Sequence, residues 1–314
     1  MFEIPVVFII FNRPDHTKKT FDIIRKLKPF QLFIIADGPR LDFPGDEKKC
    51  SAARNVIKDI DWNCKVFKNY EKKNIGPKKK ITTGLNWVFE HVDQAIILED
   101  DCLAGSDFFY YCQELLNYYE NNDKIWLITG NNFQNGNWRG QDSYYFSKYP
   151  HTWGWATWKR AWAHYTNDIP FWNNWKVSNS WKELMPDKVE RKFWEKIFDQ
   201  VYSGQDTYAF DYAWVANIWY HKGLTATPNI NLVKNIGHDI HASSTKLPSD
   251  IANVNIGKLP ETLKHPKIIK LDLEADKYDF NNSFGGRKLR FPYNIILFPR
   301  RLIMFILRKI KRLF

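Results

Sequence analysis

The sequence predicts an α/β fold built on a doubly wound, mostly parallel sheet with helices on both faces. Two patterns predict it. Short apolar runs rich in β-branched residues alternate with longer segments of helical spacing over the first 130 residues. Polar clusters follow three of these runs directly, as expected where buried strands end in loops. This alternation is typical of parallel sheets.

The first elements are the clearest. Residues 6–11 form a continuous apolar run, which predicts a buried strand, and Asn12-Arg13-Pro14 ends it. Residues 17–27 have apolar side chains on one side and are expected to form a helix. Residues 32–35 form the second expected strand, which ends at an Asp-Gly-Pro sequence beginning with Asp37.

The same alternation continues along the chain. The further expected strands are residues 65–70, 95–98 and 125–129. The further expected helices are residues 51–60, 79–92, 108–121, 189–202 and 211–221. In sheets of this kind, ligands bind beyond the carboxyl ends of the strands.

Composition and charge exclude several classes of protein. With 314 residues and 17% aromatic residues, the chain can bury a large core and is not a disordered protein. Nine Lys and Arg residues and no acid lie between Arg287 and Phe314, so without this tail the net charge falls from +11 to +2. The basic character therefore belongs to the tail, and a nucleic-acid partner is not predicted.

The four cysteines show no metal-binding spacing, and the N-terminus lacks the pattern of a signal peptide, so we expect a cytoplasmic protein with isolated thiols. The expected domain covers residues 1–265. It has a nucleotide-binding half at 1–130 and a Trp-rich acceptor half at 131–265. Residues 280–314 are expected to form a separate basic, amphipathic tail.

The acid triplet, Glu99-Asp100-Asp101, stands directly after the apolar run at 95–98. Consecutive carboxylates repel each other and lose solvation next to a sheet. A divalent cation at the end of the strand would neutralise them, and hard oxygen ligands suit Mg²⁺ or Mn²⁺. The alternative is a solvated acidic turn.

Two other strand ends carry charged residues. Arg13 follows the first strand and could face a nucleotide diphosphate, or it could be a surface arginine in a turn. Asp37 follows the second strand and could accept a hydrogen bond from a base or ribose, or it could simply favour the turn. Three clusters that meet at one sheet edge are stronger evidence for a ligand-binding site than any one of them alone.

The later part of the chain contributes aromatic and titratable groups. Twelve of the fourteen tryptophans lie between residues 126 and 219, mostly as expected core, although a Trp face also suits a sugar ring. Asp211 begins an aromatic helix and is either a helix cap or a general base, with Asp206 as the alternative base. His238 and His241 could reach a metal or diphosphate, or they could be loop histidines.

Taken together, these residues resemble those of nucleotide-sugar-dependent glycosyltransferases of the GT-A fold. The chain is most similar to the N-acetylglucosaminyltransferase I family and to bacterial family-2-like relatives, over about residues 4–242. The acid triplet, with the Asp-Phe-Phe-Tyr-Tyr sequence that begins at Asp107, is similar to the family's EDD variant of the DxD motif. The Asn12-Arg13 pair and the Trp-rich 154–162 segment also match. The family's DDW element has two acids, whereas Asp211 here stands alone.

The resemblance implies a role for each matched position. Asp101 would bind Mn²⁺ or Mg²⁺, and the other two acids of the triplet would contact its water shell, the ribose or the sugar. Arg13 and Asp37 would hold the nucleotide, and His238 would line the diphosphate or metal. Asp211 would be the catalytic base. The implied activity is inverting transfer of a sugar from a nucleotide donor, most simply a UDP-sugar, to a hydroxyl of a surface glycan or lipid-linked acceptor.

The C-terminal sequence indicates how such an acceptor would be reached. Residues 300–314 place apolar side chains on one helical face and basic ones on the other, but the longest apolar stretch is far below the ~20 residues needed to span a bilayer. This pattern is typical of a helix lying on an anionic membrane, here the inner face of the cytoplasmic membrane. The alternative is a helix docked on the protein itself.

Two other functional classes remain open. A GT-A-like nucleotidyltransferase would need a Gly-rich, basic phosphate loop after the first strand, and Asn12-Arg13-Pro14-Asp15 is not such a loop. A non-catalytic protein that binds membranes or nucleic acid through its tail leaves the acid triplet unexplained.

Overall fold

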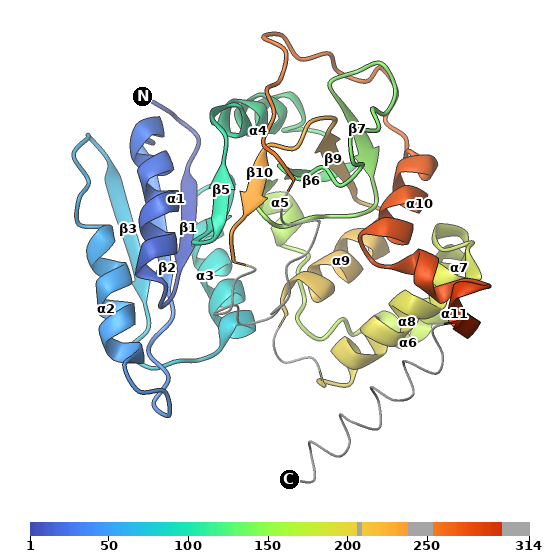
Figure 1. Cartoon of the computed structure of the whole chain (residues 1–314), viewed down its shortest axis with the longest axis horizontal. Helices are drawn as coiled ribbons and strands as arrows, with labels where there is room; N and C mark the ends of the chain where they lie inside the picture. Colours follow the sequence, from blue (N-terminus) through green and yellow to red (C-terminus); the bar gives the residue numbers. More distant parts are fainter. Residues whose placement is uncertain (206–208, 238–253, 297–314) are drawn as a thin grey trace.

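The computed structural model describes residues 1–205, 209–237 and 254–296, and in them an eight-stranded mixed sheet with helices on both faces (Figure 1). The strand order is β3 (Lys65–Tyr70), β2 (Gln31–Ala36), β1 (Val6–Ile10), β4 (Gln94–Glu99), β8 (Trp155–Trp158), β6 (Ile125–Thr129), β9 (Leu224–Pro228) and β7 (Tyr144–Ser147). The first four strands are parallel, and β8 is antiparallel to both β4 and β6. The predicted α/β class is confirmed.

The parallel strands end close together because of their register. In β1, Ile10 pairs with Ala36 of β2 and Ile9 pairs with Glu99 of β4. The polar residues that follow these three strands therefore begin at one sheet edge. A second sheet of two strands, β5 (Cys102–Ala104) and β10 (Val233–Asn235), starts there directly after the acid triplet.

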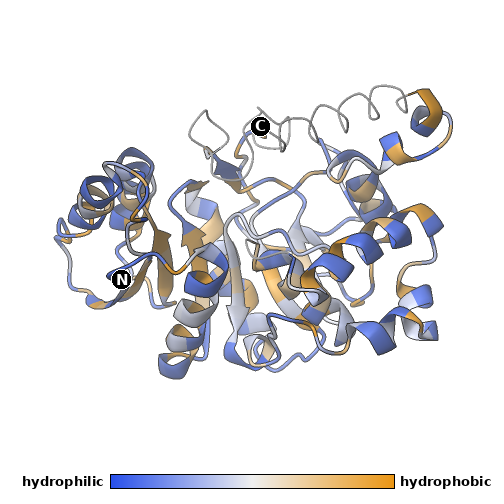
Figure 2. Cartoon of the chain, turned by 90° about the horizontal axis from the view of Figure 1, so that it is seen from below, coloured by the Kyte–Doolittle hydropathy of each residue, from blue (hydrophilic) through white to orange (hydrophobic). Residues whose placement is uncertain are grey.

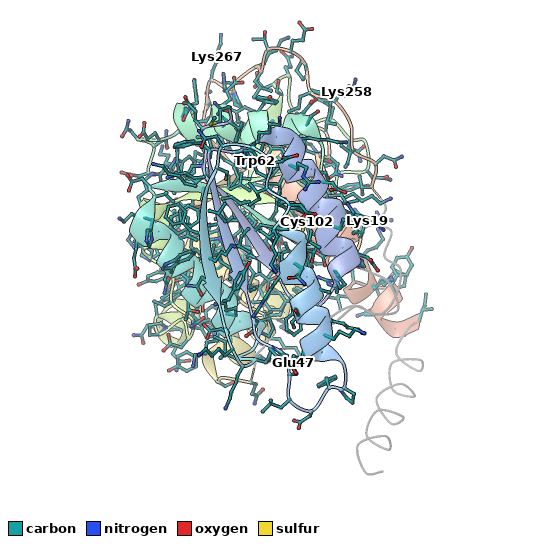
Figure 3. All side chains as sticks on the ribbon, turned by 90° about the vertical axis from the view of Figure 1, so that its left-hand side faces the viewer. Lys19, Glu47, Trp62, Cys102, Lys258 and Lys267 are labelled. Atoms are coloured by element: carbon teal, nitrogen blue, oxygen red, sulfur yellow. The ribbon has the colours of Figure 1, made fainter. Side chains whose placement is uncertain are left out.

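Helices cover the sheet in two layers, and alternate side chains of β1 pack into two hydrophobic cores, one on each face of the sheet. Val6, Phe8 and Ile10 pack with α1 (Pro14–Leu27) and α4 (Ser106–Tyr118). Val7 and Ile9 pack with the layer of α3 (Pro77–His91), α8 (Lys188–Tyr202) and α9 (Asp211–Tyr220). Figure 3 looks onto α1 and α2 (Asp46–Val56), which carry Lys19 and Glu47, with Cys102 of β5 beside α1.

The Trp-rich segment forms mainly core, as expected. It includes the short helices α5 (Lys159–Trp162), α6 (Trp172–Lys176) and α7 (Asn179–Leu184) and the strands β7 to β9, which the sequence patterns did not predict. Of the tryptophans between residues 126 and 219, all but Trp138 and Trp153 are buried. Trp138 is 51% exposed, and Trp153 is partly exposed.

The C-terminal helix α10 (Leu273–Asn282) belongs to the domain and lies beside β7 (Figure 1). Its Phe280 is fully buried, and Asp276 accepts a 2.6 Å hydrogen bond from Ser147. A short 3₁₀ helix, Gly286–Leu289, packs against the same core. The domain therefore extends past the predicted boundary at residue 265 and includes the start of the predicted tail.

The described chain ends with α11 (Tyr293–Ile296), and residues 297–314 of the predicted tail lie outside the described residues. Within the described part of the chain, no helix combines the length and apolar character needed to cross a bilayer.

Candidate active site

The acid triplet turns the chain from β4 into β5, and its three side chains have different surroundings. Asp100 is 2% exposed and is directed toward β1 and α1. One of its carboxylate oxygens accepts from the backbone N–H of Phe11 at 3.3 Å, and its carbonyl accepts from Thr20 Oγ1 at 2.8 Å. Asp100 therefore anchors the turn to the first strand and helix.

Arg13 lies between two acids of the triplet, as the shared sheet edge predicted. Its guanidinium forms an ion pair with Asp100 and a second one, at 3.0 Å, with Oδ2 of Asp101. Burial by itself would lower the pKa of Arg13, but the two carboxylates raise it above its ordinary value. The arginine thus stays charged and holds the turn in one conformation.

Asp101 is held from the other side by the last residue of β10 and the segment that follows it. Its carbonyl accepts from the N–H of Ile236 at 2.8 Å, and its Oδ1 accepts from Asn235 Nδ2 at 3.3 Å. Gly237 packs so closely that an added Cβ would lie 2.8 Å from Cγ of Asp101 and 3.0 Å from Nη1 of Arg13. The sequence patterns did not single out Asn235 or Gly237, although an isolated Gly next to a strand can mark a close backbone approach.

Glu99 is surrounded by more carboxylates than cations. Burial raises its pKa to about 8, and the nearby carboxylates of Asp101, Asp100 and Asp211 add to the effect. Burial also raises the pKa of Asp100 to about 6, against the opposing effect of Arg13. Glu99, Asp100, Asp101 and Asp211 therefore lie close enough to affect one another, and Arg13 pairs with two of these four carboxylates.

Asp211 is brought to the acid triplet from a distant part of the sequence. It is the first residue of α9, and its Oδ1 accepts from the N–H of Tyr212 at 3.0 Å. The ring of the preceding Phe210 lies 6.4 Å from that of Trp155, whose backbone pairs with Ile97 of β4. The packing of these rings places the start of α9 next to the end of β4, which explains the influence of Asp211 on the pKa of Glu99.

Asp37 lies at the same edge but already has a full set of partners. It is 6% exposed and accepts hydrogen bonds from the N–H groups of Gly38, Ile75 and Gly76 and from the amide of Asn74. These contacts give it a role in holding the loop before α3. The remaining predicted residues, Asp206, His238 and His241, lie outside the described residues.

The cluster fits a divalent cation by its chemistry. Among the described residues, no group of three or more His, Cys, Asp or Glu side chains encloses a common metal position. The cluster does present hard oxygen donors with a surplus of negative charge. Mg²⁺ and Mn²⁺ typically use one or two such carboxylates and complete their shell with water and substrate phosphate. The residues present therefore suit a cation that is shared with a substrate.

No protein-family model and no curated protein sequence matches this chain. Solved structures with some likeness include a 4-diphosphocytidyl-2C-methyl-D-erythritol synthase from Anaerococcus prevotii, with 10% identity, a TM-score of 0.35 and coverage of 71% of this chain and 88% of that one. Mouse xyloside xylosyltransferase 1 has 11% identity, a TM-score of 0.33 and coverage of 65% and 82%. HddC from Yersinia pseudotuberculosis has 11% identity, a TM-score of 0.30 and coverage of 51% and 78%. These scores are too low to support a functional conclusion.

Proposed function

We propose that this protein is an inverting, metal-dependent glycosyltransferase that moves a sugar from a nucleotide diphosphate, most simply UDP, to an acceptor hydroxyl. The main support is the meeting of two features at one sheet edge. The acid triplet suits a cation–diphosphate contact, and Asp211 lies near enough to raise the pKa of Glu99. A diphosphate site and a separate base are the two requirements of a single-displacement transfer.

A cation bound at Asp101, with Glu99 beside its water shell, would stabilise the negative charge that develops on the departing diphosphate. Asp100, whose carboxylate is buried and paired with Arg13, would hold the turn that presents these two acids. Arg13 keeps Asp101 in place and adds positive charge on the side of β1. Asp211 accepts the proton of the acceptor hydroxyl. That oxygen attacks the anomeric carbon from the face opposite the diphosphate, so the configuration at this carbon inverts.

The test is a panel of nucleotide sugars with Mn²⁺, read by mass spectrometry as donor hydrolysis and as transfer. Asp211→Asn should lose nearly all transfer and keep UDP binding, whereas Asp101→Asn should lose the Mn²⁺-dependent part of UDP binding. Asp93→Asn is the matched control, because Asp93 is 93% exposed and directly precedes β4, at the opposite edge of the sheet. Transfer by Asp211→Asn at the rate of the control would contradict the assignment.

The main competing activity is nucleotidyl transfer. In that reaction a sugar 1-phosphate would attack a nucleoside triphosphate and release pyrophosphate. Mass spectrometry of a mixture of these two substrates detects the pyrophosphate. Pyrophosphate release without any turnover of nucleotide sugars would overturn the proposal of glycosyl transfer.

We also propose that the acceptor is presented at an anionic membrane surface, on the inner face of the cytoplasmic membrane. At the end of the described chain, Phe291, Ile295 and Ile296 are 77%, 63% and 66% exposed. Figure 2 shows hydrophobic residues on α11 next to the point where the described chain ends. Exposed apolar side chains beside a basic sequence are typical of membrane-surface binding.

Co-sedimentation of the full-length protein with vesicles tests this proposal. Replacing Phe291, Ile295 and Ile296 with Ser should reduce binding to vesicles that contain an anionic lipid. Leu273→Ser is the control, since Leu273 is 69% exposed on α10. Equal sedimentation of the two variants would count against membrane contact by α11.

A further inference from the structure

Beside the acid triplet lies a group of partly exposed rings that the proposed chemistry does not use. The ring of Phe133 stands edge-on to that of Trp153, with centroids 5.5 Å apart, and edge-on to the ring of His151 at 4.5 Å. All three side chains are partly exposed, although almost every other tryptophan in this part of the chain is buried. We call Phe133, His151 and Trp153 the aromatic subsite.

Sheet order places the aromatic subsite across the acid triplet from Arg13. Trp153 comes two residues before Trp155, which pairs with Ile97 of β4, so it stands at the edge where Glu99 ends that strand. Gly154, between the two tryptophans, is packed against Val233 and Leu98. Phe133 follows β6, which is the next strand after β8. Along the edge, the order is Arg13, the acid triplet and then the aromatic subsite.

His151 is held in a single orientation by contacts with α10 and with Phe284. Its Nε2 lies 2.6 Å from Oδ2 of Asp279 on α10, and its backbone carbonyl accepts from Thr129 Oγ1 at 2.8 Å. The ring of Phe284 is stacked at 6.1 Å with an interplanar angle of 20°. When Nε2–H donates to the aspartate, Nδ1 of the neutral ring is an acceptor. Among the hydrogen bonds of the described residues, none engages that Nδ1.

A second polar atom near Trp153, Nδ2 of Asn131, lacks a hydrogen-bond partner among the described residues. Asn131 is fully buried, and its Oδ1 accepts from the N–H of Trp153 at 3.2 Å. Buried amides are almost always satisfied, so a donor left unpaired on the side chain that holds Trp153 indicates a polar ligand or water at this place.

We propose that the aromatic subsite binds the acceptor as a pyranose ring, with an apolar C–H face on Trp153 and a hydroxyl that donates to Nδ1 of His151. This inference rests on the proposed glycosyl transfer, because an acceptor is needed only if Asp211 acts as the base of that reaction. An aromatic face with a polar group at its margin matches the two sides of a sugar. The position across the triplet from Arg13 separates it from the side proposed to hold the nucleotide.

Two variants test the proposal, with methyl pyranosides as the acceptor probes. Trp153→Leu removes the flat face, and His151→Phe keeps a ring beside Phe284 but removes the acceptor nitrogen. Each should raise the acceptor KM at least tenfold while kcat/KM for donor hydrolysis without acceptor stays within twofold of wild type. Trp138→Leu is the matched control, because Trp138 is the other exposed tryptophan of this region.

Saturation-transfer NMR of the same pyranosides with the full chain separates failure of the subsite from failure of the proposed function. If wild type binds a pyranoside and Trp153→Leu binds it as well as Trp138→Leu does, the subsite is refuted. Loss of pyranoside binding in Trp153→Leu supports the subsite even if no nucleotide sugar is turned over, and that lack of turnover would overturn only the glycosyl transfer. A thermal unfolding midpoint for each variant shows that the chain is folded. Absence of pyranoside binding by wild type, together with acceptor KM values that do not change, also overturns the subsite.

Discussion

Gly237→Ala should inactivate the site without removing any group that we expect to touch a substrate. The new Cβ would lie 2.8 Å from Cγ of Asp101 and closer still to Oδ2. Ordinary carbon contacts lie at about 3.5–4.0 Å, so the carboxylate must move by about 1 Å. That movement breaks its 3.0 Å ion pair with Arg13 and its 3.3 Å hydrogen bond from Asn235.

A displacement of this size at a reacting centre can lower the rate by about 10²-fold. We expect that loss in kcat/KM for donor hydrolysis, together with weaker Mn²⁺-dependent UDP binding. Crowding a packed site should also lower the free energy of unfolding by about 1–3 kcal/mol. The assays are steady-state kinetics, titration with UDP in the presence of Mn²⁺, and chemical denaturation.

Gly136→Ala is the control for the substitution itself. Gly136 has φ +82° with open space around its Cβ position, so alanine there costs about 1–2 kcal/mol of backbone strain but leaves Asp101 untouched. This variant should be destabilised by a similar amount and stay active. If Gly237→Ala has the kcat/KM of this control, the position of Asp101 does not matter for the reaction, and the acid triplet is not the donor site.

Other predictions concern pH and packing. Because the pKa of Glu99 is raised to about 8 from an ordinary 4.5, the native state keeps a proton that the unfolded chain releases. The free energy of unfolding of the metal-free protein should therefore fall as pH rises from about 4.5 to 8. Denaturation curves should show that Glu99→Gln or saturating Mn²⁺ flattens this fall. The hydrogen bond from Arg40 lowers the pKa of Asp46 from 3.8 to about 2, so its stabilisation is present above about pH 4 and is lost as pH falls toward 2; Asp46→Asn should remove that part of the acid transition, and an unchanged transition would refute it. Phe280→Ala should cost about 3–5 kcal/mol, since the ring is fully buried, and a loss below 1 kcal/mol would show that α10 is not part of the core.

The main architecture could be predicted because it follows from local patterns. Continuous apolar runs identified β1, β2 and β4 to within two residues at each end. Strand β8 was missed because its burial results from packing between aromatic rings and leaves no regular period in the sequence. Trp155 and Trp158, for example, both lie in β8, and both are buried.

By itself, the sequence determined that three acids follow a buried strand and that charged residues follow two others, because strand ends are set by neighbouring residues. Only the tertiary structure decided what each acid does. Asp100 is paired with Arg13, 87 residues away, and Asp101 is held by Asn235, 134 residues away. His151 is oriented by Asp279 across 128 residues. Such partners are chosen by the packing of whole strands and helices, and no local pattern records which of several charged side chains will meet.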